Sequence, residues 1–120
     1  MNNYIQIYNN ALSDDYCDEL KEKFESCSYN ESFDQGPMSF SQINLNQHPE
    51  WKADVKKLTT KFTKYINQYE QDCAITPEMW PNSYAFEEMR LKRYLSNGKD
   101  EFRPHVDAIT PASAIRFLVF

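Results

Sequence analysis

The residues best suited to chemistry in this sequence are His105 and Asp107, which flank Val106. In an extended backbone, residues two apart project to the same face, so the imidazole and the carboxylate would converge while Val106 points the other way into apolar surroundings. One imidazole and one carboxylate are two of the three ligands of the 2-His-1-carboxylate facial triad, which holds Fe(II) and leaves positions open. A hydrogen-bonded surface histidine beside an aspartate is the alternative interpretation of the same pattern.

The remaining candidate ligands are weaker. His48 stands two residues before Glu50 but at a predicted helix entry, where residues two apart do not share a face, so we interpret it as a capping or surface residue. A hydrolytic zinc site on His105 and Asp107 is a further alternative, although the sequence offers no additional nearby His or Cys. The cysteines have no C-x-x-C spacing and are predicted to be small hydrophobes in a reducing compartment: Cys17, Cys27 and Cys73.

Two amphipathic helices are predicted in the first two thirds of the chain. Ser13-Asp14-Asp15 is typical of a helix start, and we expect that helix to end near Ser28. Its apolar face consists of Tyr16, Leu20, Phe24 and Cys27. His48-Pro49-Glu50 indicates the entry to the second helix, whose apolar stripe consists of Val55, Leu58, Phe62, Tyr65, Ile66 and Tyr69. Its other face is predicted to be solvated and carries Lys52, Lys56, Lys57, Lys61 and Lys64.

Short strands are predicted around these helices. Candidate strands cover residues 4–8, 40–45, 89–95, 102–107 and 114–120, of which the last is the most β-prone. Residues 30–39, which include Gly36-Pro37, are predicted to form a loop, and residues 96–100 a turn. The chain ends within the apolar stretch 117–120, which would be an aggregation-prone edge if left unpaired. We therefore expect the sequence to be cut short relative to its domain.

Composition limits the class of protein and the partners. The 120 residues suffice for one domain, and a hydrophobic content of 41% excludes a wholly disordered chain. The net charge of −5, without a basic block, predicts that nucleic acid is not a partner. No apolar run is long enough to predict a membrane span, and no secretory signal precedes the first helix. The sequence therefore predicts a cytoplasmic protein with no membrane partner.

The last third of the chain resembles the prolyl 4-hydroxylase-like family of Fe(II)/2-oxoglutarate dioxygenases. The family pattern is an Arg-Leu-x-x-Tyr strand, a Gly-containing turn, a Phe-x-x-His-x-Asp segment and an arginine that opens an apolar strand. This sequence has these features in that order, at residues 90–94, Gly98, residues 102–107 and Arg116. The two N-terminal helices look like those of small bacterial and phage-type members.

The resemblance implies a fold and the roles of four residues. The fold would be α+β, with N-terminal helices packed on an incomplete double-stranded β-helix, or jelly roll. A single domain would cover residues 1–120, with a helical part at 1–83 and the first core strands at 84–120. His105 and Asp107 would be the first two iron ligands. Tyr94 would contact 2-oxoglutarate, or alternatively be a core aromatic residue, and Arg116 would lie near the substrate side, or alternatively form a structural ion pair.

The resemblance also implies an activity. Such an enzyme hydroxylates a peptidyl proline or a similar C–H substrate with release of succinate and CO₂, using Fe(II), 2-oxoglutarate and ascorbate. The distal histidine and the basic residue that binds 2-oxoglutarate cannot be placed in this sequence, so we expect weak or no turnover from the 120-residue chain. The alternative is a non-catalytic binding protein that docks a partner, or associates with itself, through the C-terminal strand edge.

Overall fold

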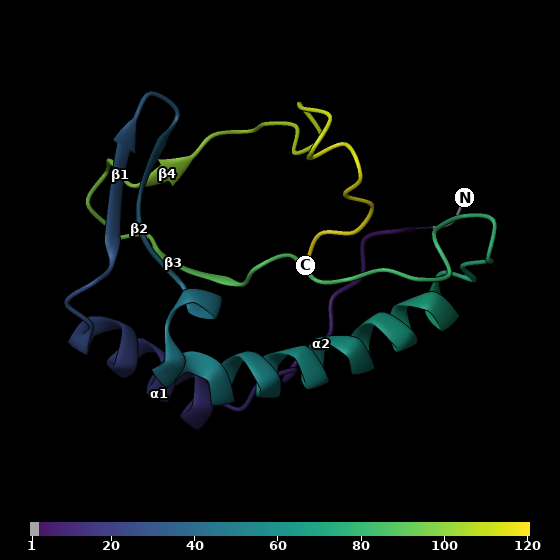
Figure 1. The fold of residues 1–120 in the computed structure, drawn as a ribbon, viewed down its shortest axis with the longest axis horizontal. Helices are drawn as coiled ribbons and strands as arrows, with labels where there is room; N and C mark the ends of the chain where they lie inside the picture. Colours follow the sequence, from purple (N-terminus) through teal and green to yellow (C-terminus); the bar gives the residue numbers. More distant parts are fainter. Residues whose placement is uncertain (1–2) are drawn as a thin grey trace.

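The computed structural model describes residues 3–120 and combines two helices with a small antiparallel sheet (Figure 1). The mixed α+β class is therefore confirmed. In chain order the elements are α1 (Asp14–Ser26), β1 (Glu31–Gln35), β2 (Met38–Asn44), the 3₁₀ turns η1 (Leu45–Gln47) and η2 (Pro49–Trp51), α2 (Lys52–Asp72), β3 (Arg90–Arg93) and β4 (Glu101–Phe102).

Both predicted helices form, and their starts have the expected causes. The Ser13 side chain accepts a hydrogen bond from the Tyr16 backbone N–H at 3.2 Å, as an N-cap should. Helix α1 ends at Ser26, two residues earlier than predicted, because Cys27 is already extended. Helix α2 follows the 3₁₀ turn that contains Pro49. Its lysines are exposed and its buried positions are Leu58 and Ile66, as the periodicity predicted.

The predicted loop at residues 30–39 is wrong, because these residues belong to a β-hairpin. Strands β1 and β2 pair antiparallel from Glu31↔Gln42 to Gln35↔Met38, which leaves Gly36-Pro37 as a two-residue turn. Gly36 has a φ of +56°, a conformation that glycine adopts readily, and it precedes a proline whose ring fixes a negative φ. The sequence pattern did not predict β1 because its residues are mostly polar. It is an edge strand that is stabilised by pairing with β2.

Strand β2 is the centre of the sheet. One edge pairs with β1, and the other pairs with β3 at residues 41–44 and with β4 at residues 38–39. Strands β3 and β4 therefore form one interrupted neighbour of β2, shorter than the two strands predicted at 89–95 and 102–107. Asp100 closes the intervening loop, because its carboxylate accepts hydrogen bonds from the Leu95 N–H at 2.8 Å and the Ser39 hydroxyl at 2.9 Å.

The hydrophobic core lies between α1, the start of α2 and one face of the sheet. Trp51 is fully buried, and its indole N–H donates to the Tyr29 hydroxyl at 2.9 Å. Ile43 of β2 is 1% exposed and meets the helices from the sheet side. The buried residues of this cluster are Tyr16, Leu20, Phe24, Ile43, Leu45, Trp51 and Leu58.

The predicted N-terminal strand is wrong, because residues 4–8 are irregular and have no strand partner. The segment is held by side chains of α2 instead. The Tyr69 hydroxyl donates to the Tyr4 carbonyl at 2.7 Å, and the Tyr8 hydroxyl donates to the Asp72 carboxylate at 2.8 Å. A β-prone composition yields a strand only where a neighbouring edge is available for pairing.

The predicted C-terminal strand is also wrong. Residues 111–115 form turns and residues 116–120 are irregular, so the described chain has no strand edge there. The aromatic residues of this segment pack on side chains: Phe120 lies 4.9 Å from Phe62, and Phe117 lies 5.3 Å from Trp80, between ring centroids. Self-association stays a prediction, but in this structure the C-terminal segment offers no strand edge through which it could occur.

A half-buried ion pair between the helices yields a stability prediction. The Asp54 carboxylate accepts hydrogen bonds from the Lys23 ammonium at 2.6 Å and the Tyr16 hydroxyl at 2.8 Å. Burial opposes ionisation of Asp54, but these hydrogen bonds outweigh it and hold its pKa below the usual value. We expect Asp54→Asn to lower the free energy of unfolding by about 1–3 kcal/mol at pH 7.

The same network sets the pH range of that effect. Because the folded-state pKa of Asp54 is depressed, its stabilisation is present above the unfolded pKa and disappears as the pH falls through the folded one. Urea unfolding at neutral and strongly acidic pH measures this. The gap between the wild type and Asp54→Asn should narrow in acid, and an equal gap at both pH values would contradict the assignment.

Candidate functional site

The candidate site lies on the sheet face that points away from α1. Leu91 and Arg93 of β3 point toward the helix: Leu91 packs on the core, and the Arg93 guanidinium lies 5.3 Å from the Phe24 ring. Because side chains alternate along a strand, Arg90 and Lys92 project from the opposite face. We call this the far face and define it by Phe40, Arg90, Lys92, Tyr94 and Phe102.

Aromatic rings cover the far face and lead to His105. Phe40 is 5% exposed, and its ring centroid lies 5.4 Å from Tyr94 and 5.8 Å from Phe102. Phe102 in turn stacks on the His105 imidazole, with centroids 3.9 Å apart. The Lys92 ammonium lies 4.5 Å from the Phe40 centroid and 4.8 Å from that of Phe102. The imidazole is therefore held in place by ring packing from the sheet.

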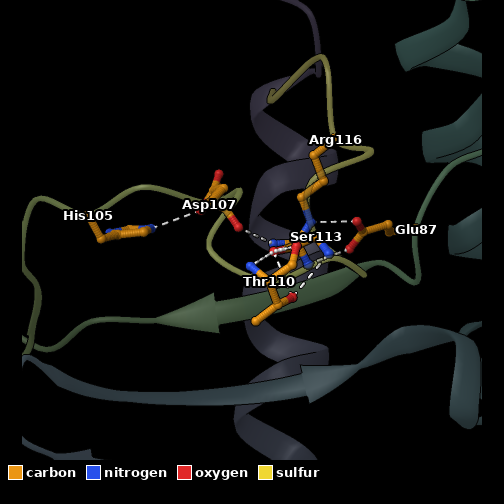
Figure 2. Close-up of polar contacts among 6 residues, drawn as sticks. All are labelled: Glu87, His105, Asp107, Thr110, Ser113 and Arg116. Atoms are coloured by element: carbon orange, nitrogen blue, oxygen red, sulfur yellow. Dashed lines mark hydrogen bonds and ion pairs between the residues drawn. The ribbon is translucent and has the colours of Figure 1, made fainter.

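His105 and Asp107 do converge, as their spacing predicted. The His105 Nε2 atom lies 3.0 Å from the Asp107 Oδ1 atom, and Figure 2 shows the ring directed at the carboxylate. The other ring nitrogen, Nδ1, lies 2.8 Å from the Arg103 carbonyl oxygen. Val106 does not enter apolar surroundings, since it is 67% exposed, and that part of the expectation is wrong.

Local contacts fix the segment that carries this pair. The Arg103 N–H donates to the Pro37 carbonyl at 3.1 Å, which ties the segment to the hairpin turn. Beyond the pair, Thr110 and Ser113 exchange hydrogen bonds within a turn, with their hydroxyl oxygens 3.0 Å apart (Figure 2). This turn returns the chain so that Arg116 reaches back toward Asp107.

Arg116 forms an ion pair in the structure. Its Nη2 atom donates to the Glu87 carboxylate at 2.9 Å, its Nε donates to the other carboxylate oxygen, and Nη1 donates to the Asp107 carbonyl at 3.3 Å (Figure 2). The hydrogen bond from Arg116 lowers the pKa of Glu87. Arg116 thus stabilises the backbone of residues 105–107. Its contact with Glu87 matches the alternative interpretation of Arg116 as part of a structural ion pair. Its expected substrate-side role stays a prediction.

Tyr94 follows β3 on the same face as His105. It contacts Phe40 and is 43% exposed, and partial burial raises the pKa of its hydroxyl. The ring is therefore partly a packing element, while the exposed part of the side chain faces solvent. The expected contact with 2-oxoglutarate stays a prediction.

The structure does not bring His48 to this site. Its imidazole stacks on Tyr29, with ring centroids 4.0 Å apart, between the two 3₁₀ turns. Within residues 3–120, no cluster contains three or more His, Cys, Asp or Glu side chains able to hold a metal ion. Cys73 is buried, Cys17 and Cys27 are half-buried, and all three are free thiols, as predicted for small hydrophobes.

Sequence reasoning missed the cations of the far face. Arg90 and Lys92 belong to an alternating strand that also leads to Tyr94, and this alternation was the available signal. Their relation to His105 depends on the pairing of β4 with β2, which places Phe102 near Phe40. The sequence alone does not predict the pairing of β4 with β2.

Comparisons with models of protein families, with curated proteins and with solved structures find no match to this chain. In the described part of the chain, neither helix combines the length and the apolar composition that crossing a bilayer demands.

Proposed function

We propose that the chain carries part of the active site of an Fe(II)/2-oxoglutarate-dependent dioxygenase of the prolyl 4-hydroxylase type. Its substrate would be a peptidyl proline or a similar C–H group. The observation that carries the proposal is the 3.0 Å approach of the His105 Nε2 and Asp107 Oδ1 atoms on the far face of the sheet.

The donor pair fits a divalent metal ion. When Nδ1 carries the single proton and donates it to the Arg103 carbonyl, the Nε2 lone pair is free to bind a metal ion together with the Asp107 carboxylate. A protonated imidazole would instead donate from Nε2 to Asp107, as a hydrogen-bonded surface histidine does. Ligand atoms at right angles around a metal, with bonds of about 2.1 Å, lie about 3.0 Å apart. A hydrogen bond from the second imidazole nitrogen to a backbone carbonyl is the usual support for a metal-binding histidine.

The remaining residues have supporting roles in this proposal. Bound Fe(II), kept reduced by ascorbate, would supply O₂-dependent oxidation of the C–H bond coupled to decarboxylation of 2-oxoglutarate. Tyr94 would donate its hydroxyl proton to a hydrogen bond with 2-oxoglutarate, and Phe102 would orient the His105 ring by stacking. Arg116 would hold the Asp107 backbone through its hydrogen bond to the carbonyl.

The arrangement of layers supports the finer fold that we propose, a partial jelly roll. Helix α1 packs against one face of an antiparallel sheet, and the candidate metal ligands lie on the other face. A jelly roll is built from two facing antiparallel sheets. In the proposed fold, the far face would be the inner surface of one of these sheets.

An anaerobic spectroscopic experiment tests the function. The chain is mixed with Fe(II) and millimolar 2-oxoglutarate, and the visible charge-transfer absorption of an Fe(II)–2-oxo acid chelate is compared with that of the free mixture. We expect the protein to enhance this absorption and the His105→Ala/Asp107→Ala variant to lose the enhancement. Equal spectra for the two proteins would contradict the proposal.

A second candidate function, binding of a partner or of another copy, is favoured by one observation. Apolar side chains near the C-terminal end of the described chain are strongly exposed: Ile115 at 80%, Val119 at 71% and Phe120 at 65%. Size-exclusion chromatography with and without Fe(II) and 2-oxoglutarate separates the candidates. Dimers that form without these ligands favour the binding function.

A further inference from the structure

Two cations on the far face form no ion pair with a carboxylate, although the charge of Arg90 helps to lower the pKa of Glu87 and the charge of Asp107 opposes the lowering of the pKa of Lys92. Outside α2, six lysines and arginines of the described chain form ion pairs with acidic side chains, and they are Lys21, Lys23, Arg93, Lys99, Arg103 and Arg116. Among residues 3–120, the two outside α2 that lack such a pair are Arg90 and Lys92. In this chain of net charge −5, Arg90 and Lys92 are therefore the two cations of the sheet without an ion pair, and the other lysines without one lie on α2.

The two cations border the candidate metal ligands. Arg90 and Lys92 lie two residues apart on β3, so their side chains share the far face. The Lys92 ammonium sits over the rings of Phe40 and Phe102, and Phe102 stacks on His105. Burial and the charge of Arg90 lower the pKa of Lys92, while the charge of Asp107 acts in the opposite direction. Lys92 is therefore within electrostatic reach of both the other cation and the metal-binding pair.

Neighbouring like charges repel each other, and an anion placed between them attracts both and offsets that repulsion. A guanidinium also matches the geometry of a carboxylate, to which it can donate two parallel hydrogen bonds. Beside these cations, Tyr94 and Phe102 are 43% and 36% exposed and offer apolar surface. A peptide with an acidic side chain next to an apolar one satisfies both features, whereas a small dicarboxylate leaves the rings uncovered.

We propose that Arg90 and Lys92 bind a carboxylate of the substrate, which makes the substrate an acidic peptide segment. This inference rests on the proposed function, because it takes the neighbouring His105–Asp107 pair as the reaction centre. In the complex, the Arg90 guanidinium and the Lys92 ammonium donate hydrogen bonds to the substrate carboxylate. The apolar part of the peptide covers the exposed edges of Tyr94 and Phe102.

A metal-free titration tests the inference. The ¹⁵N-labelled chain is titrated with the capped peptide acetyl-Glu-Pro-Glu-amide and with its Gln-Pro-Gln counterpart, and amide shifts are followed by NMR. We expect the glutamate peptide to shift β3 and the His105 segment and to bind at least about tenfold more tightly than the glutamine peptide. Arg90→Gln/Lys92→Gln should abolish this preference, and Lys56→Gln/Lys61→Gln on α2 is the matched control that should keep it.

Three outcomes would overturn the inference: equal affinity for the two peptides, loss of the preference in the α2 control, or displacement of the peptide by 2-oxoglutarate. The last outcome would show that Arg90 and Lys92 bind a carboxylate of 2-oxoglutarate rather than one of the substrate. Because the titration contains no metal, its failure leaves the metal site untouched. Retained peptide preference in a chain that binds no metal would contradict the proposed function alone.

Discussion

Replacing His105 by alanine should lower the affinity of the chain for Co(II) or Mn(II) at least about 100-fold. Loss of a hydrogen-bonded partner behind a metal ligand already costs about 10–100-fold, so loss of the ligand itself belongs at or beyond the upper end. The imidazole is 41% exposed in its side chain, and its removal leaves Phe102 packed on Phe40. We therefore expect the fold to persist, and isothermal titration calorimetry measures the change in affinity.

The second histidine provides a matched control. His48→Ala removes an imidazole that stacks on Tyr29, away from Asp107, and should leave the metal affinity within about twofold of the wild type. Asp107→Asn keeps the side-chain volume but removes the charge, and it should weaken binding as His105→Ala does. Equal losses in the His48 and His105 variants would contradict the assignment of the site.

Trp51→Ala should be the most destabilising truncation of a single side chain in the core. Trp51 is fully buried among the core residues of α1, β2 and α2, and truncation of a buried Trp costs about 3–5 kcal/mol. The substitution also leaves the Tyr29 hydroxyl without its indole donor. Since domains of this size have unfolding free energies of about 5–15 kcal/mol, we expect a variant that is at best marginally folded.

The second tryptophan is the control for this prediction. Trp80 is only half-buried and packs on Tyr69 and Phe117 outside the core cluster, so Trp80→Ala should cost about 1 kcal/mol. Urea unfolding followed by far-UV circular dichroism compares the two variants. A Trp51→Ala chain with a midpoint close to that of Trp80→Ala would show that the core is not centred on Trp51.

The helices were predictable because their signals are local. An N-cap serine, acidic residues in the first turn and apolar residues three and four apart determine α1 within its own sequence. The strands depend on partners that residue order does not reveal. Glu31–Gln35 is polar yet forms β1 because it pairs with β2, whereas the strongly β-prone residues 116–120 form no strand because they pair with none of the sheet's strands.

The candidate site, like the fold, could be predicted from the sequence only in part. Convergence of His105 and Asp107 was predicted from a spacing of two residues in an extended segment. The structure confirms that the two side chains approach each other, but residues 103–107 are irregular rather than a strand. The ring stack that orients His105 depends on Phe40, which is separated from it by more than half of the chain and meets it through β4. The unpaired state of Arg90 and Lys92 emerges only when the carboxylate partners of the other cations are known.

Paramagnetic NMR with Mn(II) tests the central claim, a divalent-metal site at His105 and Asp107, most directly. Substoichiometric Mn(II) broadens amide resonances near its binding site, so the ¹⁵N spectrum locates the metal without any need for turnover. The account predicts that the amide resonances of Phe102, Arg103 and residues 105–107 broaden first, and that His105→Ala removes this effect. Broadening that begins at the acidic residues of α1 or near His48, with residues 103–107 unaffected, would contradict it.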